Sequence, residues 1–220
     1  MIGSAVPAKR IKRKKIASRR GKYDRSLSTT ERRADQHAKL LDVATQVIAS
    51  NGFGQTTVET IVAKAGMSRR TFYEHFDDVR DVLSHVYDRA ATISFTMVAS
   101  RVRAEPDPLT GVRLGAATYF EAVATYPEVA RVMFEEYRLA GPEYEARYQR
   151  DSLKYAELMF DSLKAAFEKG QLTRPPTERV VFVFSKGIES LAMREIARGE
   201  HKQLPGMADE IAELVISAFR

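Results

Sequence analysis

One run of the chain, TVETIVAKAGMSRRTFYEHF at positions 57–76, constrains the fold more than any other part of the sequence. Its apolar spacing and its central glycine predict two short helices joined by a tight turn, because Gly66 tolerates positive φ. Thr57 and Ser68 can cap the two helices, since their side-chain oxygens accept hydrogen bonds from free backbone N–H groups. The pattern is typical of a helix-turn-helix, whose second helix lies in the major groove of DNA.

The second of these helices carries side chains suited to reading bases. Arg69 and Arg70 stand at its start, where a recognition helix meets base edges, and arginine is the commonest bidentate partner of guanine. Phe72 and Phe76 are four residues apart and are expected to be buried, which leaves Tyr73 outside to donate to a phosphate. The alternative interpretation is an ordinary solvated surface helix, since capped helices that carry arginines are common.

Helical spacing continues nearly to the end of the chain, interrupted at glycines and prolines. The segment VVFVF at 180–184 could form a strand in isolation, but the residues after it continue at helical spacing. We therefore predict an all-α protein of about nine helices. Their expected ranges are 33–51, 57–65, 68–76, 77–103, 109–125, 127–138, 143–169, 177–198 and 206–219.

Positive charge is concentrated at the N-terminus. Residues 1–30 hold ten Lys and Arg and one Asp, a net charge of +9, whereas the whole chain carries only +6. Residues 31–80 hold seven basic and seven acidic side chains and are neutral. Residues 1–30 therefore read as a basic, disordered arm that follows DNA phosphates, with a merely solubilising arm as the alternative.

Other features exclude several classes of protein. Cysteine is absent, which excludes disulfides and thiolate chemistry and fits a cytoplasmic protein. No apolar run is long enough to span a membrane. The four histidines are scattered, and no phosphate-binding glycine loop or serine-hydrolase motif is present. We expect no enzymatic activity, no cofactor and no metal.

Residues 40–83 closely resemble the DNA-binding domain of the TetR/AcrR family of bacterial transcriptional regulators. The resemblance rests on Gly52-Phe53, on Thr-Thr-Val at 56–58, on the run from Ile61 to Ser68, and on Thr71-Phe72-Tyr73-Glu74-His75-Phe76. The remaining helices match the family only in length, number and order.

This resemblance implies which residues lie at or near DNA. One position departs from the family, which usually has a lysine where this chain has Val79, so Arg80 is a candidate to replace that backbone contact. The implied DNA-binding residues are Thr57, Ser68, Arg69, Arg70, Thr71, Tyr73, His75 and Arg80.

The resemblance also implies a small, mostly apolar effector held between the fourth and seventh helices, where aromatic and Met side chains are dense. Plain core is the alternative. The candidate pocket residues are Phe95, Met97, Tyr119, Phe120, Tyr126, Met133, Phe134, Tyr137, Tyr155 and Met159. Arg113 and Arg131 would suit an anionic effector, but surface ion pairs are the more common role of such side chains.

The last two helices carry more apolar residues than one packing face needs, which favours a symmetric dimer over a purely intramolecular core. The expected dimer interface comprises Val181, Phe184, Ile188, Leu191, Ile211, Leu214 and Val215.

These observations predict three parts: the arm (1–30), a three-helix helix-turn-helix domain (31–80), and a larger helical effector-binding and dimerisation domain (81–220). We expect a homodimeric repressor that binds a palindromic operator in double-stranded DNA and is released by its effector. One alternative is an architectural, low-specificity DNA-binding protein that relies on the arm. Another is a ligand-binding module whose helix-turn-helix has lost DNA binding.

Overall fold

A computed structural model describes residues 28–220 of the chain. The predicted basic arm lies outside the described residues except for 28–30, which belong to the first helix and its cap. The Glu31 N–H donates to Ser28 Oγ (3.2 Å), and the Ser28 N–H donates to Glu31 Oε2 (2.8 Å). This capping box starts the helix at Thr29, a few residues earlier than apolar spacing alone predicts.

The described part of the chain is all-α, as predicted, and the 180–184 segment is helical. Nine helices result if α6, η2 and α7 are counted as one continuous helix. The elements are α1 (Thr29–Asn51), η1 (Phe53–Gln55), α2 (Val58–Ala65), α3 (Arg69–Tyr73), α4 (Val79–Ala104), α5 (Pro108–Thr125), α6 (Pro127–Arg131), η2 (Val132–Glu136), α7 (Tyr137–Leu139), α8 (Pro142–Glu168), α9 (Glu178–Ala197), η3 (His201–Gln203) and α10 (Leu204–Ser217).

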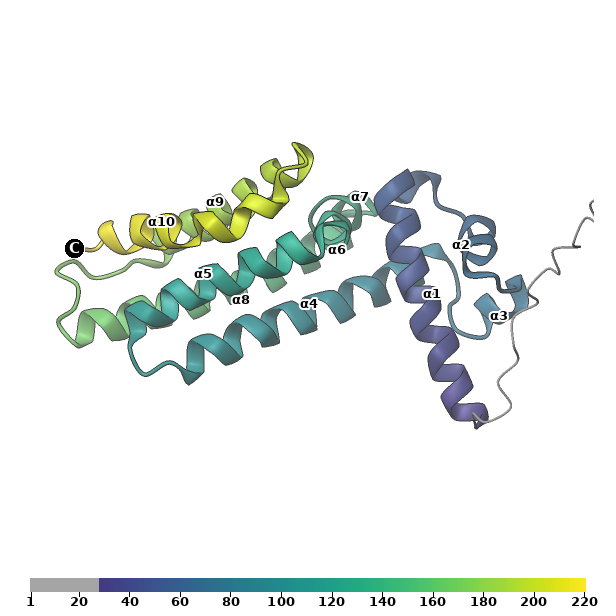
Figure 1. Ribbon diagram of the computed structural model, residues 1–220, viewed down its shortest axis with the longest axis horizontal. Coiled ribbons are helices and arrows are strands. Elements are labelled where there is room, and N and C mark those ends of the chain that lie inside the picture. The colour runs from purple at the N-terminus through teal and green to yellow at the C-terminus, as the bar shows by residue number, and fades with distance from the viewer. Residues whose placement is uncertain (1–27) are drawn as a thin grey trace, which may run out of the picture.

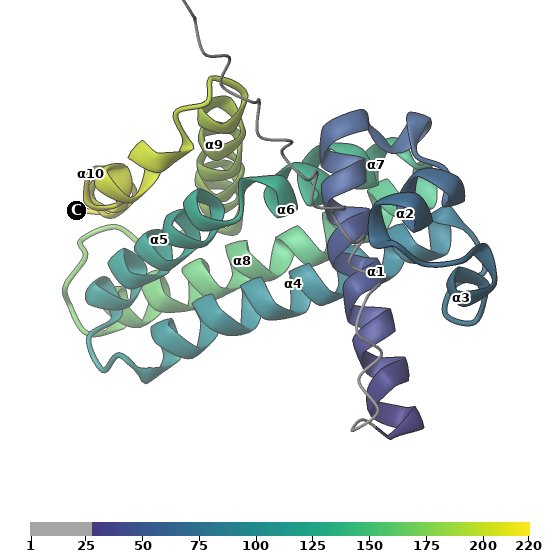
Figure 2. The same cartoon turned by 45° about the vertical axis from the view of Figure 1, so that its right-hand side comes forward.

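The helices form two connected bodies (Figure 1). Helices α4, α5 and α8 run side by side along the length of the molecule, and α9 and α10 cover one side of them. Helices α1, α2 and α3 gather at one end, where α1 crosses the start of the long bundle (Figure 2). None of the helices in residues 28–220 has the length and apolar character of a membrane span.

The core of the N-terminal end does not stop at the predicted boundary near residue 80. Phe72 and Phe76 are buried as expected, and they belong to the same apolar cluster as Val132, Tyr137 and Tyr148 of the bundle. The Tyr87 and Tyr137 rings stack within this cluster with centroids 3.8 Å apart. A displacement of either body therefore has to be accommodated by the other, because packed interiors do not deform freely.

One stretch of the bundle departs from regular α-helix. Residues 132–136 form a π-helical turn between α6 and α7, a rare feature that is frequent at functional sites. Both Val132 and Glu136 are buried. The segment from Val132 to Ala140 is referred to below as the 132–140 segment.

The prediction for the dimer interface needs correction in its helical register. Val181 and Val215 are buried in the chain's own core. Phe184 packs partly against that core, Leu191 and Ile211 pack against a second internal cluster, and Ile188 lines a cavity described below. Only Leu214 of the predicted set is strongly exposed. The intramolecular core thus uses most of these side chains, because one face of α9 is needed to cover the bundle.

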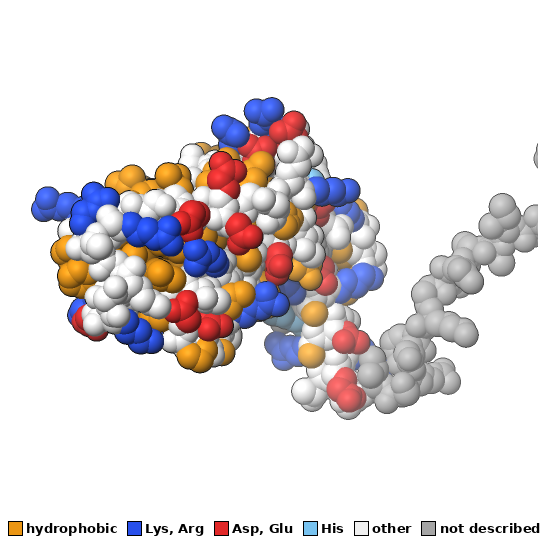
Figure 3. All heavy atoms as spheres, turned by 60° about the vertical axis from the view of Figure 1, so that its left-hand side comes forward, with side chains coloured by type: hydrophobic (Ala, Val, Ile, Leu, Met, Phe, Trp, Pro, Cys, Tyr) orange, Lys and Arg blue, Asp and Glu red, His pale blue; other side chains and the backbone are white. Residues whose placement is uncertain are grey.

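A different set of apolar side chains is exposed on α9. Val180, Phe182 and Val183 are 41%, 38% and 67% exposed, and Leu214 of α10 is 58% exposed. Figure 3 shows a face of the bundle on which apolar side chains lie beside charged ones. The exposed apolar positions on α9 precede the predicted ones by one residue or more.

Candidate functional site

The helix-turn-helix forms from local interactions that the sequence encodes. The Thr60 N–H donates to Thr57 Oγ1 (3.2 Å), and the Thr71 N–H donates to Ser68 Oγ (3.0 Å), so both predicted caps are present. Gly66 adopts φ 65° and ψ 36°, the left-handed conformation that lets the turn close. The second helix, α3, is therefore held at a fixed angle to α2.

The exposed side chains of α3 form a polar surface that points away from the core. Arg69 contacts Glu59 at 2.8 Å, and Arg70 contacts Glu74 at 3.1 Å. These are exposed ion pairs, with the Arg70 side chain 90% exposed, so they contribute little stability. Tyr73 is half exposed on the same helix. Both arginines can leave their acidic partners for a base or a phosphate at low cost.

His75 lies at the edge of this surface. Its ring contacts the His37 ring edge-on at 5.7 Å, and Nε2 is buried with no hydrogen-bond partner among the described residues. Burial lowers the pKa of His75, and the nearby Arg33 guanidinium lowers it further. The His75 imidazole packs the residues that follow α3 against His37 of α1.

Arg80 differs from the other predicted DNA-binding residues. Its Nη1 donates to the Ala140 carbonyl, and its guanidinium lies 5.7 Å from the centre of the Phe53 ring. The side chain thus joins the start of α4 to the end of the 132–140 segment. The structure places it between the two bodies, whereas Thr57, Ser68, Arg69, Arg70, Thr71 and Tyr73 share the α2–α3 surface.

A cavity of about 530 Å³ lies inside the bundle, between α4, α5, α8 and α9. The end of the cavity farther from α1 is apolar and is lined by small or aliphatic side chains from α4, α5 and α8. Gly115 keeps α5 close to α4, because a Cβ there would lie 3.2 Å from Val102 Cγ2. The residues of this end include Val98, Val102, Val112, Ala116, Leu158 and Met159.

Six of the ten predicted pocket residues line this cavity, namely Phe95, Tyr119, Met133, Phe134, Tyr155 and Met159. The other four do not. Phe120 is buried in a separate cluster against α10, and Tyr137 stacks on Tyr87. Met97 and Tyr126 are 39% and 61% exposed at the surface. The density of aromatic and Met residues in the sequence cannot tell a cavity-lining side chain from a core or surface one, because all four residues have similar apolar neighbours on their helices.

Polar groups also line the cavity. Arg147 of α8 is paired with Asp88 of α4. Tyr155 Oη donates to Ser94 Oγ (2.9 Å), and burial raises the pKa of Tyr155 to about 12. The buried Tyr119 hydroxyl has no partner within residues 28–220. The cavity thus combines an apolar end with polar side chains that can orient a polar group of a ligand.

Arg113 and Arg131, the two candidates for an anionic effector, form ion pairs instead. Arg113 contacts Glu213 at 2.6 Å, and Arg131 contacts Glu135 at 3.3 Å. Neither residue lines the cavity. Across the described chain, no group of three or more His, Asp or Glu side chains is placed to hold a metal ion.

The 132–140 segment connects the cavity to the helix-turn-helix. Met133 and Phe134 line the cavity. Two residues further on, Glu136 Oε2 accepts a hydrogen bond from the Phe53 N–H (2.7 Å), directly after the end of α1. Arg80 binds the other end of the segment at Ala140. The 132–140 segment therefore joins the cavity wall to the end of α1 and to the start of α4.

Sequence reasoning missed several of these residues. Glu136 is 8% exposed and is paired with a backbone N–H of a distant segment, but Arg131, Glu135 and Arg138 lie near it in the sequence, so no pattern marked it as buried. No signal in one sequence brings together side chains of α8 and α9, which contact each other only through tertiary packing. The missed cavity residues include Asp88, Arg147, Tyr148, Ser152 and Glu189.

Comparisons with known proteins agree with this architecture. Residues 40–86 match the sequence profile of the bacterial regulatory proteins of the tetR family. The chain is 27% identical over 111 residues to the HTH-type transcriptional regulator EthR of Mycolicibacterium smegmatis, a match that covers 50% of this chain and 51% of EthR.

Two solved structures share the fold over most of the chain. The fatty acid degradation regulator FadR from Bacillus halodurans superposes with a TM-score of 0.76 at 20% identity, covering 84% of this chain and 96% of that one. The transcriptional regulator FadR from Bacillus subtilis, in complex with stearoyl-CoA, gives a TM-score of 0.73 at 19% identity, covering 84% and 100%.

A helix-turn-helix with an exposed polar surface, attached to a helical bundle, defines a DNA-binding transcriptional regulator. Within this chain, residues 40–86 are a DNA-binding domain of the tetR family of bacterial regulatory proteins.

Proposed function

We propose that this regulator is a homodimeric repressor that leaves its operator when a long-chain acyl compound fills the bundle cavity. The observation that carries this proposal is the cavity itself, whose wall at Met133 and Phe134 continues into the contact between Glu136 and Phe53. A ligand in such a cavity is coupled to the DNA-binding end by direct packing.

The size and lining of the cavity support an acyl ligand. A small group the size of a water molecule occupies ~30 Å³, so a volume of about 530 Å³ holds roughly 18 such groups. The apolar end suits a hydrocarbon chain, and the polar side chains of the lining suit its head group. Bacillus subtilis FadR, which shares the fold, binds stearoyl-CoA.

Release of DNA follows from the contacts of the 132–140 segment. A ligand that displaces Met133 or Phe134 moves Glu136 and Ala140, and with them the end of α1 and the start of α4. Since α3 is fixed to α1 through a shared core, its position relative to a second copy changes. The ligand shifts the equilibrium only by as much as it prefers the displaced state.

Dimerisation through α9 and α10 is supported by their exposed apolar side chains, Val180, Val183 and Leu214. A symmetric dimer presents two α3 helices to half-sites about 34–36 Å apart, or at a multiple of that spacing. The proposed DNA-reading residues are those of the α2–α3 surface together with His75, and Arg80 is reassigned to the contact between the bodies.

The same proposal covers the organisation of the chain. Residues 1–30 form the arm, 31–80 the DNA-binding domain and 81–220 the effector-binding domain, with no catalytic role. Because it binds DNA, the protein acts in the bacterial cytoplasm.

DNA-site selection from random duplexes tests the DNA-binding part. We expect enrichment of a palindrome that binds roughly 10³-fold more tightly than random DNA. Removal of residues 1–27 should weaken binding to all duplexes and flatten the salt dependence, because fewer counterions are released. If the full-length protein enriches no palindrome and removal of residues 1–27 abolishes its binding to DNA, the architectural alternative replaces the repressor.

A further inference from the structure

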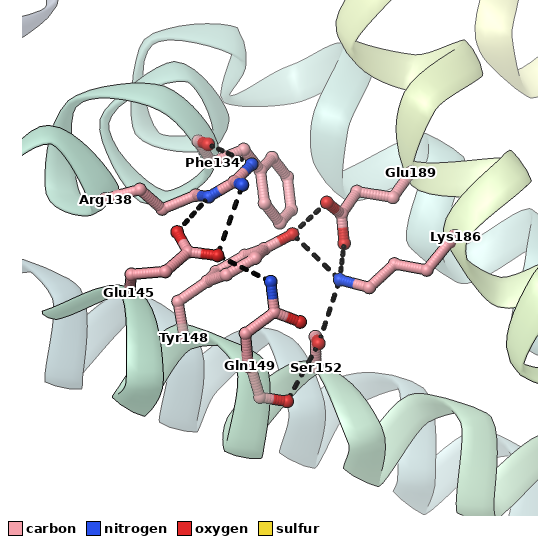
Figure 4. A network of polar contacts seen from close by, with 8 residues as sticks. All are labelled: Phe134, Arg138, Glu145, Tyr148, Gln149, Ser152, Lys186 and Glu189. Atoms are coloured by element: carbon pink, nitrogen blue, oxygen red, sulfur yellow. Dashed lines mark hydrogen bonds and ion pairs between the residues drawn. The ribbon is translucent and has the colours of Figure 1, made fainter. Parts of the chain in front are cut away.

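A polar cluster closes the cavity wall between α8 and α9 (Figure 4). Lys186 and Glu189 come from α9, whereas Tyr148 and Ser152 come from α8. Tyr148 Oη donates to Glu189 Oε1, and Lys186 Nζ lies 3.2 Å from Glu189 Oε2. The Glu189 side chain is only 18% exposed. A carboxylate at this depth is held by its two partners, because an unpaired buried charge is costly.

The cation of this cluster has no capacity left for a ligand. Lys186 Nζ donates to Tyr148 Oη (3.1 Å), to Ser152 Oγ (2.9 Å) and to Glu189 Oε2, which accounts for all three of its N–H bonds. Lys186 is also absent from the cavity lining, whereas Tyr148, Ser152 and Glu189 belong to it. The carboxylate of Glu189 thus belongs to the cavity wall, whereas Lys186 does not.

Glu189, by contrast, keeps acceptor capacity on the cavity side. Each of its oxygens receives one hydrogen bond, and an ionised carboxylate can accept about four in total. A ligand hydroxyl or amide N–H could therefore bind it directly. A ligand carboxylate would meet a like charge in a region of low dielectric constant, where repulsion is strong.

We propose that Glu189 makes the cavity select ligands with a long hydrocarbon chain and a neutral head group that donates a hydrogen bond, and makes it reject the corresponding carboxylates. This inference rests on the proposed binding of a long apolar ligand in the same cavity. It assigns Glu189 as the residue that determines head-group specificity, with Tyr148 and Lys186 holding its carboxylate in place.

The charged groups around Glu189 agree with this assignment. Arg138 and Glu145 form an ion pair with each other at 2.6 Å, and Arg147 of the cavity lining is paired with Asp88, so neither pair adds net charge to the wall. Tyr119 from α5 contributes a neutral hydroxyl. Burial raises the pKa of Glu189 to about 7, although the Arg138 guanidinium opposes this rise. Glu189 is therefore ionised in mildly alkaline solution and loses its charge in mildly acidic solution.

The test uses two probes with the same twelve-carbon chain, dodecanol and laurate, at submicellar concentration and about pH 8. Calorimetry on the full-length protein should show dodecanol binding roughly tenfold or more tighter than laurate. Glu189→Gln should reduce this ratio about tenfold. Glu178→Gln, the same change at an exposed position of α9, should leave the ratio unchanged.

A second measurement needs no variant. Lowering the pH from about 8 to about 6 should reduce the ratio of dodecanol affinity to laurate affinity in the wild-type protein, because Glu189 gains a proton. Laurate binding more tightly than dodecanol would overturn the proposal and make Lys186 the carboxylate receptor. So would a ratio that is unchanged in Glu189→Gln and across this pH range. If neither probe binds, the acyl-cavity proposal itself fails, an outcome distinct from binding without selectivity.

Discussion

The two ends of this molecule differ in how completely their interiors are packed. Around α3 the interior is filled: Phe72 and Ile61 are fully buried, and Phe76 is 2% exposed. Between α4, α5 and α8 the chain leaves a cavity of about 530 Å³. The filled end fixes the geometry of side chains that project outward, whereas the end with the cavity can respond to what enters it. The rigid core that supports recognition thus lies at the α1–α3 end, and the cavity that permits regulation lies in the bundle of the same continuous fold.

The largest expected effect contrasts one phenylalanine from each end. Phe72→Ala should lower the free energy of unfolding by about 3–5 kcal/mol, because it opens a void in a filled core. Phe95→Ala should cost roughly 1–2 kcal/mol, because Phe95 already borders the cavity and loses fewer contacts. Urea unfolding measures both values. Equal losses would show that the two interiors are packed alike.

The free energy of unfolding should also depend on pH, because Glu189 in the cavity wall titrates. The pKa of Glu189 is about 7 in the folded chain, against ~4.3 for an unfolded glutamate. As pH rises, the folded state keeps the Glu189 proton to a higher pH than the unfolded state does. The stabilisation from this protonated side chain is therefore greatest below the pKa of the unfolded chain, and it is lost as pH rises through 7. Between about pH 5 and pH 8, the free energy of unfolding of the wild type should fall by up to ~3 kcal/mol more than that of Glu189→Gln. Parallel pH profiles for the two proteins would contradict this.

At the filled end, Arg70→Ala should weaken binding to the selected operator by about 1–3 kcal/mol and relax the preference for its base pair. Its stability should be unchanged, because the Arg70 side chain is 90% exposed. Lys64→Ala, an exposed charge on α2 outside the proposed reading surface, serves as the matched control. An equal effect of both changes on every duplex would mean that Arg70 contributes only charge.

The smallest effect concerns the connection between the ends. Glu136→Ala leaves the Phe53 N–H without its partner and should reduce stability by about 1 kcal/mol. More informative is the ratio of operator affinities without and with ligand, which should fall several-fold towards one. Glu135→Ala, the neighbouring acid paired with Arg131, should leave that ratio unchanged. A full ligand response in Glu136→Ala would place the coupling elsewhere.

How well the sequence predicts structure differs between the two ends for a physical reason. The helix-turn-helix depends on local interactions, such as the Ser68 cap and the positive φ of Gly66, which short-range patterns reveal. The helical bundle depends on which face of each helix points inward. Apolar spacing identified α9 as a helix but could not decide whether Val180 or Val181 faces solvent, because both are valines on a largely apolar helix.

The cavity was predictable only in part for a related reason. A cavity is an absence of packing, and neither composition nor periodicity records where side chains fail to fill space. Phe120 and Tyr119 are adjacent, yet one is core and the other lines the cavity. Glu136 and Glu189 carry the polar contacts of the two ends, and each finds its partner on a distant segment.

The most direct test of the account measures operator affinity with and without stearoyl-CoA, in the wild type and in Ala116→Phe. This change fills the apolar end of the cavity, and Thr125→Phe is its control at an exposed position on the same helix. We predict that stearoyl-CoA weakens wild-type and Thr125→Phe binding roughly tenfold or more and has little effect on Ala116→Phe. Equal release from Ala116→Phe and the wild type would contradict the claim that the cavity controls DNA binding.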